Sequence, residues 1–322
     1  ILDGAPGVPP DARVSIRFNT LVSQTLALQN ITVAPLLTTT HVYSYYSYYD
    51  NAVELSWFKE PRTRYTITIG SDIADFYGNT LGQEQSFSFT TGDYSPFARL
   101  ELERFTHFSA NTLPRAGILV RNLDSIAVEL YRLPNDMLFQ LTGSNEWDAW
   151  QAYRPLDSAE NRIWRREYDT SGNANVTVRQ VITLTDAAGD VLPPGAYLVN
   201  VDRPGVDPDD FTDRSRAAVF LSNSNLLIKK SEHGNSLAWL TDLSTGDPIA
   251  DTEVRFYLDG DLVGEGVTNA EGVVTARLDI PLGQGWTPIV AVSGEPGDNA
   301  YAFVSSNWSN GIAPWEFDIS GG

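Results

Sequence analysis

Residues 65–93 read YTITIGSDIADFYGNTLGQEQSFSFTTGD, and an alternating run stands near each end of this stretch. In Tyr65–Ile69 and in Ser86–Thr90 every second residue is apolar. Successive side chains of a strand point to opposite faces of a sheet, so this alternation predicts half-buried β-strands. The turn formers Gly78-Asn79 separate the two runs, as expected between antiparallel neighbours.

The same pattern with a period of two recurs along the whole chain. Short runs of this kind, spaced about 8–12 residues apart and bounded by Gly, Pro, Asn and Asp, are typical of antiparallel β-sandwiches. Short helices are predicted only at Ser71–Tyr77 and Asn145–Tyr153. The further predicted strands are Arg13–Phe18, Ala116–Val120, Ile126–Leu130, Asn175–Leu184, Ala196–Val201, Ala217–Leu221, Leu226–Ile228, Leu237–Leu240, Glu253–Leu258, Val273–Leu278, Thr287–Val292 and Tyr301–Ser305.

Composition narrows the class of protein. The 322 residues are 42% hydrophobic and 11% aromatic, enough for several packed cores, and they include no cysteine. Disulfides, thiolate nucleophiles and cysteine metal sites are therefore excluded. The formal net charge is −19, which disfavours binding to nucleic acid or to anionic membrane surfaces. No apolar run approaches the ~20 residues of a membrane helix. The chain opens Ile1-Leu2-Asp3 without a methionine or a signal peptide, so we expect the parent protein to be longer.

Polar breaks divide the chain into three predicted domains. Tyr94-Ser95-Pro96 follows one strand, and Ser222-Asn223-Ser224-Asn225 separates two others, which gives domains at 1–93, 94–222 and 223–322. Each domain should have its own core, with modest interfaces between neighbours. The middle domain carries an irregular insertion at Asn135–Glu167.

Two segments resemble known bacterial modules. Asp11–Val22 (DARVSIRFNTLV) together with residues 65–93 resembles a bacterial Ig-like domain of surface proteins. Leu226–Leu278, which contains LAWLTDLSTGDPIA and GEGVTNAEGV, resembles a macroglobulin-like domain of bacterial alpha-2-macroglobulins. In the middle segment, Pro193–Val199 (PPGAYLV) matches a strand entry that is common in such domains.

The resemblance implies an all-β fold of tandem Ig-like and macroglobulin-like antiparallel β-sandwich domains. It also implies a non-catalytic scaffold segment of a bacterial alpha-2-macroglobulin-like protease-trapping inhibitor, extracytoplasmic, with proteases engaged by other parts of the full-length protein. The alternatives are Ig-like modules of a cell-surface adhesin or glycan-binding protein, or an accessory region of a secreted hydrolase. Gly82-Gln83-Glu84-Gln85 is only superficially like the family's thioester sequence, because it lacks the cysteine.

The sequence offers no constellation that predicts an active site or a cofactor. His41, His107 and His233 stand far apart, without a neighbouring ligand motif. Asp202–Asp213 (DRPGVDPDDFTD) bunches carboxylates that could hold calcium, but the EF-hand spacing is missing and a solvated loop is favoured.

Aromatic clusters leave two binding alternatives open. The stretch Tyr43–Tyr49 could be a protein or glycan contact surface, although a strand with tyrosines on both faces is favoured. Trp147, Trp150 and Trp164 could stack on sugars, but core or interface positions are favoured. Trp239, in the middle of a predicted strand, is expected to face a sandwich core.

Overall fold

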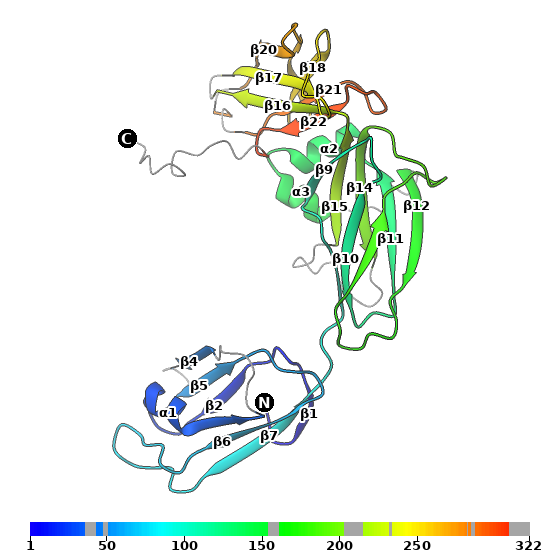
Figure 1. The fold of residues 1–322 in the computed structure, drawn as a ribbon. Helices are drawn as coiled ribbons and strands as arrows, with labels where there is room; N and C mark the ends of the chain where they lie inside the picture. Colours follow the sequence, from blue (N-terminus) through cyan, green and yellow to red (C-terminus); the bar gives the residue numbers. More distant parts are fainter. Residues whose placement is uncertain are drawn as a thin grey trace. The chain divides into compact units, whose positions relative to one another are not determined.

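The computed structural model describes residues 1–35, 43–47, 51–153, 161–202, 215–231, 234–281, 283–284 and 287–308. Two compact units are formed, one by residues 1–96 with 171–177 and the other by residues 97–170 with 178–322 (Figure 1). In both units the strands dominate and the helices are short.

The first unit is a two-layer sandwich. The alternation read from the sequence explains its core, since Tyr65, Ile67 and Phe89 are buried while the threonines and serines between them are more exposed. Tyr65 stacks on Phe89 with ring centroids 5.7 Å apart. One layer has the strand order β1-β7-β6-β3 and the other β2-β5-β4. The elements are β1 (Ala5–Val8), β2 (Val14–Arg17), α1 (Gln24–Asn30), β3 (Ile31–Ala34), β4 (Tyr43–Ser47), β5 (Ala52–Ser56), β6 (Arg64–Ile69) and β7 (Gln85–Thr91).

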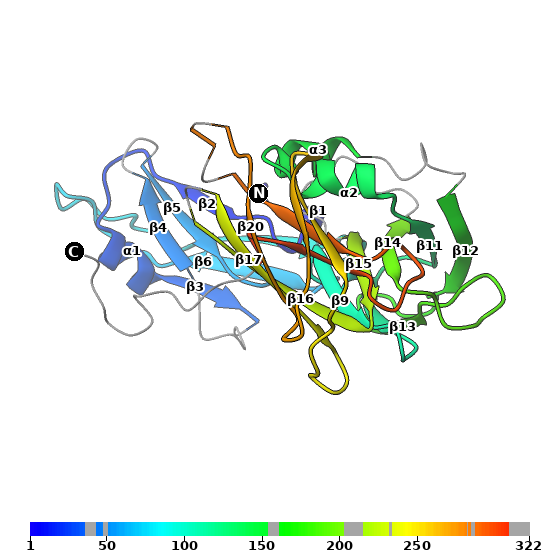
Figure 2. The same ribbon diagram turned by 90° about the horizontal axis from the view of Figure 1, so that it is seen from above.

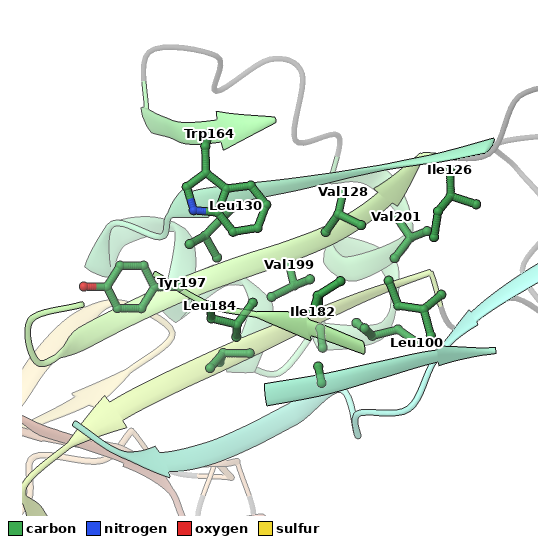
Figure 3. Close-up of a cluster of buried hydrophobic side chains, with 14 of the residues drawn as sticks. Leu100, Ile126, Val128, Leu130, Trp164, Ile182, Leu184, Tyr197, Val199 and Val201 are labelled. Carbon is green, nitrogen blue, oxygen red and sulfur yellow. The ribbon is translucent and has the colours of Figure 1, made fainter. Parts of the chain in front are cut away.

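The second unit begins with a sandwich whose layers have the orders β8-β10-β13 and β12-β11-β14-β15-β9. Apolar side chains from both layers fill the space between them (Figure 3), and the indole Nε1 of Trp164 donates to the Thr185 carbonyl at 2.7 Å. Two helices follow β11. The elements are β8 (Phe97–Leu100), β9 (Phe105–Ser109), β10 (Arg115–Arg121), β11 (Ser125–Arg132), α2 (Asn135–Thr142), α3 (Glu146–Ala152), β12 (Arg162–Asp169), β13 (Val178–Thr183), β14 (Gly195–Asp202) and β15 (Arg216–Ser222).

The PPGAYLV stretch has a local structural explanation. The Tyr197 hydroxyl donates to the Pro193 carbonyl at 2.7 Å, which fixes the corner where the chain enters β14. Burial raises the pKa of Tyr197 to about 12. The aromatic ring lies in the sandwich core, so this tyrosine joins the corner to the packing below it.

The same unit continues into another sandwich, with layers β16-β17-β20 and β19-β18-β21-β22 (Figures 1 and 2). Its tight turns need glycine. Gly272 has φ +72°, and a Cβ there would lie 2.4 Å from the Leu240 carbonyl oxygen. The strands are β16 (Ser224–Lys230), β17 (Asn235–Asp242), β18 (Glu253–Leu258), β19 (Asp261–Val267), β20 (Val273–Arg277), β21 (Val290–Ser293) and β22 (Ala302–Ser305).

The predicted all-β class is confirmed, whereas the helices were predicted only in part. Helix α3 confirms the prediction at residues 145–153. The helix predicted at Ser71–Tyr77 is wrong, because Asp75 Oδ1 accepts the backbone N–H groups of Tyr77 and Asn79 at 2.8 Å and closes a turn there. Helices α1 and α2 were not predicted.

The prediction that Trp239 faces a core is also wrong. Its side chain is 44% exposed, and its Nε1 donates to the Glu271 carbonyl at 3.2 Å. Along β17 the inward positions are Ser236, Ala238 and Leu240, all of them buried. Because the pleat alternates, Trp239 must point outward.

Candidate functional site

The most extensive feature beyond the separate cores is a seam between the two sandwiches of the second unit. Phe220 on β15 stacks on Phe303 on β22, with ring centroids 5.2 Å apart. Trp308 packs against both rings, 5.1 Å from Phe220 and 5.7 Å from Phe303. The ring of His107 on β9 stacks on Phe220, with ring centroids 4.8 Å apart. These contacts join strands that belong to different sheets into one aromatic cluster, in which Phe220 and Phe303 are buried, Trp308 is half-buried and His107 is exposed.

The helices of the insertion complete the seam. Phe139 on α2 stacks on Tyr257 on β18, with centroids 4.4 Å apart. Between α2 and α3, the backbone N–H and the hydroxyl of Ser144 donate to the two carboxylate oxygens of Asp259 at 2.7 and 2.8 Å. The irregular insertion therefore reaches the β18–β19 hairpin with both apolar and polar contacts.

Hydrogen bonds of buried serines hold the chain in place where β15 ends and β16 begins. The Ser222 hydroxyl, which has a single proton to donate, lies 2.6 and 2.5 Å from the carbonyl oxygens of Ser224 and Tyr301. The Ser224 hydroxyl donates to the Asn299 carbonyl at 2.9 Å. The expectation of a modest interface at this boundary is thus wrong. A continuous hydrophobic cluster leaves the two sandwiches little freedom to move independently.

Two buried charged groups were not singled out in the sequence. The side chain of Glu129 is 1% exposed and accepts from Arg165, Arg162 and Asn200 at 3.1, 3.3 and 3.2 Å. Burial opposes ionisation of this carboxyl group, but the hydrogen bonds from Arg165 and Asn200 prevail and lower its pKa. A carboxylate saturated in this way acts as a structural anchor rather than as a general base.

Lys59 in the first unit is likewise fully buried. Its Nζ donates to the Ala12 carbonyl at 2.6 Å and to the Pro10 and Trp57 carbonyls at 3.5 Å, and it lies 4.1 Å from the centroid of the Trp57 ring. Burial lowers its pKa to about 8. The three carbonyls occupy the amine, so it caps backbone groups and is not placed to attack a substrate.

Several residues singled out in the sequence lie outside the described residues. These are His41, His233 and the loop 203–214, so the calcium hypothesis stays untested. His107 lies at the seam, and its Nε2 is 3.3 Å from the Phe303 carbonyl oxygen. Of the tyrosine-rich stretch, Tyr43–Ser47 form β4, paired with β5, as the strand interpretation predicts. Gly82–Gln85 are exposed, and Gln85 is the first residue of β7.

The three tryptophans of the insertion do not form a platform. Trp150 is 7% exposed and belongs to the seam, and Trp164 is 8% exposed and lies in a sandwich core. Trp147 is 58% exposed, with the Arg104 guanidinium 5.3 Å from its ring centroid. The core and interface interpretation is therefore correct for two of the three.

Within the described ranges, no group of three or more His, Asp or Glu side chains could hold a metal ion. Over the same residues, no helix is both long and apolar enough to cross a membrane.

Comparisons with known proteins agree with this architecture. Residues 1–91 match the bacterial Ig-like domain, and residues 221–322 match the bacterial alpha-2-macroglobulin MG3 domain. The crystal structure of native alpha-2-macroglobulin from Escherichia coli spanning domains MG0-NIE-MG1 aligns over 95% of this chain and 93% of that one, with 16% identity and a TM-score of 0.54. The chain carries an MG3 domain of the bacterial alpha-2-macroglobulin type over residues 221–322.

Two longer bacterial alpha-2-macroglobulin structures have a similar fold over this segment. Salmonella alpha-2-macroglobulin reacted with methylamine aligns over 95% of this chain with 12% identity and a TM-score of 0.66. A mutant of the Salmonella protein aligns over 97%, also with 12% identity, and a TM-score of 0.67. The chain spans only 18% of the length of either Salmonella chain. No curated protein matches it in sequence.

Proposed function

We propose that this scaffold segment serves an extracytoplasmic bacterial protease-trapping inhibitor, in which other parts of the full-length protein engage the protease. The segment itself is not an enzyme in this proposal. The observation that carries the proposal is the seam, because a sandwich pair fused by an aromatic cluster suits the wall of a cage. The match of residues 221–322 to the bacterial alpha-2-macroglobulin MG3 domain supports the same assignment.

The proposal includes three sandwiches, with boundaries at 93/94 and 222/223. Three apolar clusters support this division, one in the first unit and one within each sandwich of the second. No described strand before residue 94 shares a sheet with a described strand after residue 225. The two sandwiches on either side of the boundary at 222/223 form one body in this proposal, because the seam contains residues from both.

The test uses the full-length gene product with a serine protease such as elastase. A cage obstructs large substrates but leaves the protease active site open to small ones. We therefore expect cleavage of casein to be suppressed while cleavage of a small chromogenic peptide continues. Equal inhibition of both substrates would indicate a blocked active site instead, and no inhibition of either would refute the trapping role.

The alternative function is that of an adhesin or glycan-binding protein. The three tryptophans of the insertion do not support it as a sugar-stacking surface, because Trp150 and Trp164 are buried in separate clusters. The same preparation distinguishes it. Saturable binding to immobilised glycans, in a full-length protein that leaves casein cleavage unchanged, would favour that alternative over the trap.

A further inference from the structure

The outer face of the β8-β10-β13 sheet is rich in arginine, although the protein as a whole is acidic. Ala98, Leu100, Ile118 and Val120 point into the sandwich core, so the residues between them point outward. The chain has only 22 basic residues against 41 acidic ones. The outward side chains of this one sheet include Arg99, Arg115, Arg121 and Arg179.

The strand register places these arginines around an aliphatic centre. Leu119 on β10 lies directly between Arg99 on β8 and Arg179 on β13. Two residues before Leu119 on the same strand, Gly117 pairs with Val181, whose side chain is exposed. Neighbouring strands are about 4.8 Å apart and residues two apart along a strand about 7 Å, so the arginine Cα atoms fall within about 10 by 20 Å.

Two of the arginines are held in place. The Arg121 guanidinium lies 4.7 Å from the centroid of the Phe97 ring. The Nε of Arg179 is 2.5 Å from Glu101 Oε2, and this ion pair crosses over Gly117. A Cβ at Gly117 would come within 1.9 Å of that Glu101 oxygen. Glycine therefore lets the pair lie close against the sheet, and less side-chain entropy remains to be lost on binding.

The other two arginines are exposed and available. Neither Arg99 nor Arg115 has an ion pair with any residue in the described part of the chain. Guanidinium groups recognise carboxylates through paired hydrogen bonds, and arginine is enriched in protein interfaces. An open cationic face with an aliphatic centre is complementary to an acidic and aliphatic surface.

We propose that this arginine face is a docking surface for an extended, acidic and aliphatic segment of a protein partner. A partner strand presents alternate side chains about 7 Å apart. Along β10, Arg115 lies about 14 Å before the row of Arg99 and Arg179, and Arg121 lies about 7 Å beyond it, so both spacings are multiples of that repeat. The net charge of −19 repels any anionic partner at long range, so the attraction must come from short-range pairing with the exposed arginines. The aliphatic centre at Leu119 and Val181 favours a partner with apolar side chains over a phosphate polymer or the headgroups of an anionic bilayer.

The test measures fluorescence anisotropy of a labelled ten-residue peptide of alternating Glu and Val, with the whole chain at low salt. Comparison probes are a peptide of five Glu followed by five Val, heparin and phosphatidylglycerol vesicles. The variant Arg99→Glu/Arg115→Glu removes the two available cations. Its matched control, Lys229→Glu/Arg277→Glu, changes the net charge equally at exposed positions on the β16-β17-β20 sheet.

We expect the alternating peptide to bind at least about 10-fold more weakly to Arg99→Glu/Arg115→Glu and within about 2-fold of wild type to the control. Undetectable binding to wild type, or an equal loss in both variants, would overturn the proposal. So would equal affinity for the block peptide, or tighter binding of heparin or vesicles that depends on the same arginines. Thermal unfolding checks the variants, and Arg99→Gln/Arg115→Gln replaces the first if it fails to fold.

Discussion

Replacing Phe220 with alanine tests whether the two sandwiches joined by the seam unfold as one body. Removing a buried phenylalanine costs about 3–5 kcal/mol. The ring centroid of Phe220 lies 4.8–5.2 Å from the centroids of three other aromatic rings. Each such contact adds about 0.5–1.5 kcal/mol to the stability, beyond the contribution of apolar burial. We therefore expect a loss in the upper part of that range, about 4–5 kcal/mol, a large share of a typical domain stability of about 5–15 kcal/mol.

The assay is native-state hydrogen exchange read by mass spectrometry. If the seam couples the sandwiches, Phe220→Ala should speed exchange in β18 of the neighbouring sandwich about as much as in β14, by roughly 1000-fold. The matched control is Phe89→Ala, an equally buried ring in the core of the first unit, which should leave β14 and β18 unchanged. Faster exchange in β14 alone would refute the coupling.

Three further predictions concern single positions. Lys59 has a lowered pKa of about 8 in the folded state, so above that pH the unfolded state binds the proton that the folded state releases. The unfolding free energy of the first unit should thus rise between about pH 8 and pH 9.5, and Lys59→Met should flatten this rise in urea titrations; an unchanged slope would contradict the assignment. Trp239→Ala should cost less than about 1.5 kcal/mol in the same titrations, because the ring is 44% exposed; a larger loss would restore the buried interpretation. Gly272→Ala should destabilise the protein by about 1–3 kcal/mol more than Gly246→Ala, and equal losses would be inconsistent with this. Both glycines have positive φ, but only at Gly272 would a new Cβ clash with backbone.

The sequence predicts the strands well because alternation reports directly on which side of a sheet each residue faces. The sequence does not predict which side chains face the core where apolar residues follow one another without alternation. In Leu237–Leu240 the apolar residues are consecutive, and the sequence does not say whether Trp239 or its neighbours face inward. In the structure Ala238 faces the core, where side chains of the opposite sheet pack against it, and Trp239 therefore faces outward.

The seam was missed although the sequence carries a signal for it. Ala217–Leu221 on β15 is apolar at every position, and all five residues are buried. A strand of an antiparallel sandwich with one solvated face should alternate, so a continuous apolar run indicates that both faces are covered. What covers the second face could not be read from β15 alone, because the partner residues Phe303 and Trp308 come more than eighty residues later.

The middle sandwich thus has two different outer faces. The outer face of its larger sheet, which includes Phe220, is covered by the following sandwich and by α2 and α3, and its apolar packing favours permanent association. The outer face of its smaller sheet carries exposed arginines around Leu119, which is typical of a surface that pairs with another molecule reversibly. A segment built this way is fixed to its neighbour through one sheet and open to a partner through the other. The seam and the arginine face should accordingly respond differently to salt, since apolar burial persists at ionic strengths that screen guanidinium–carboxylate attraction.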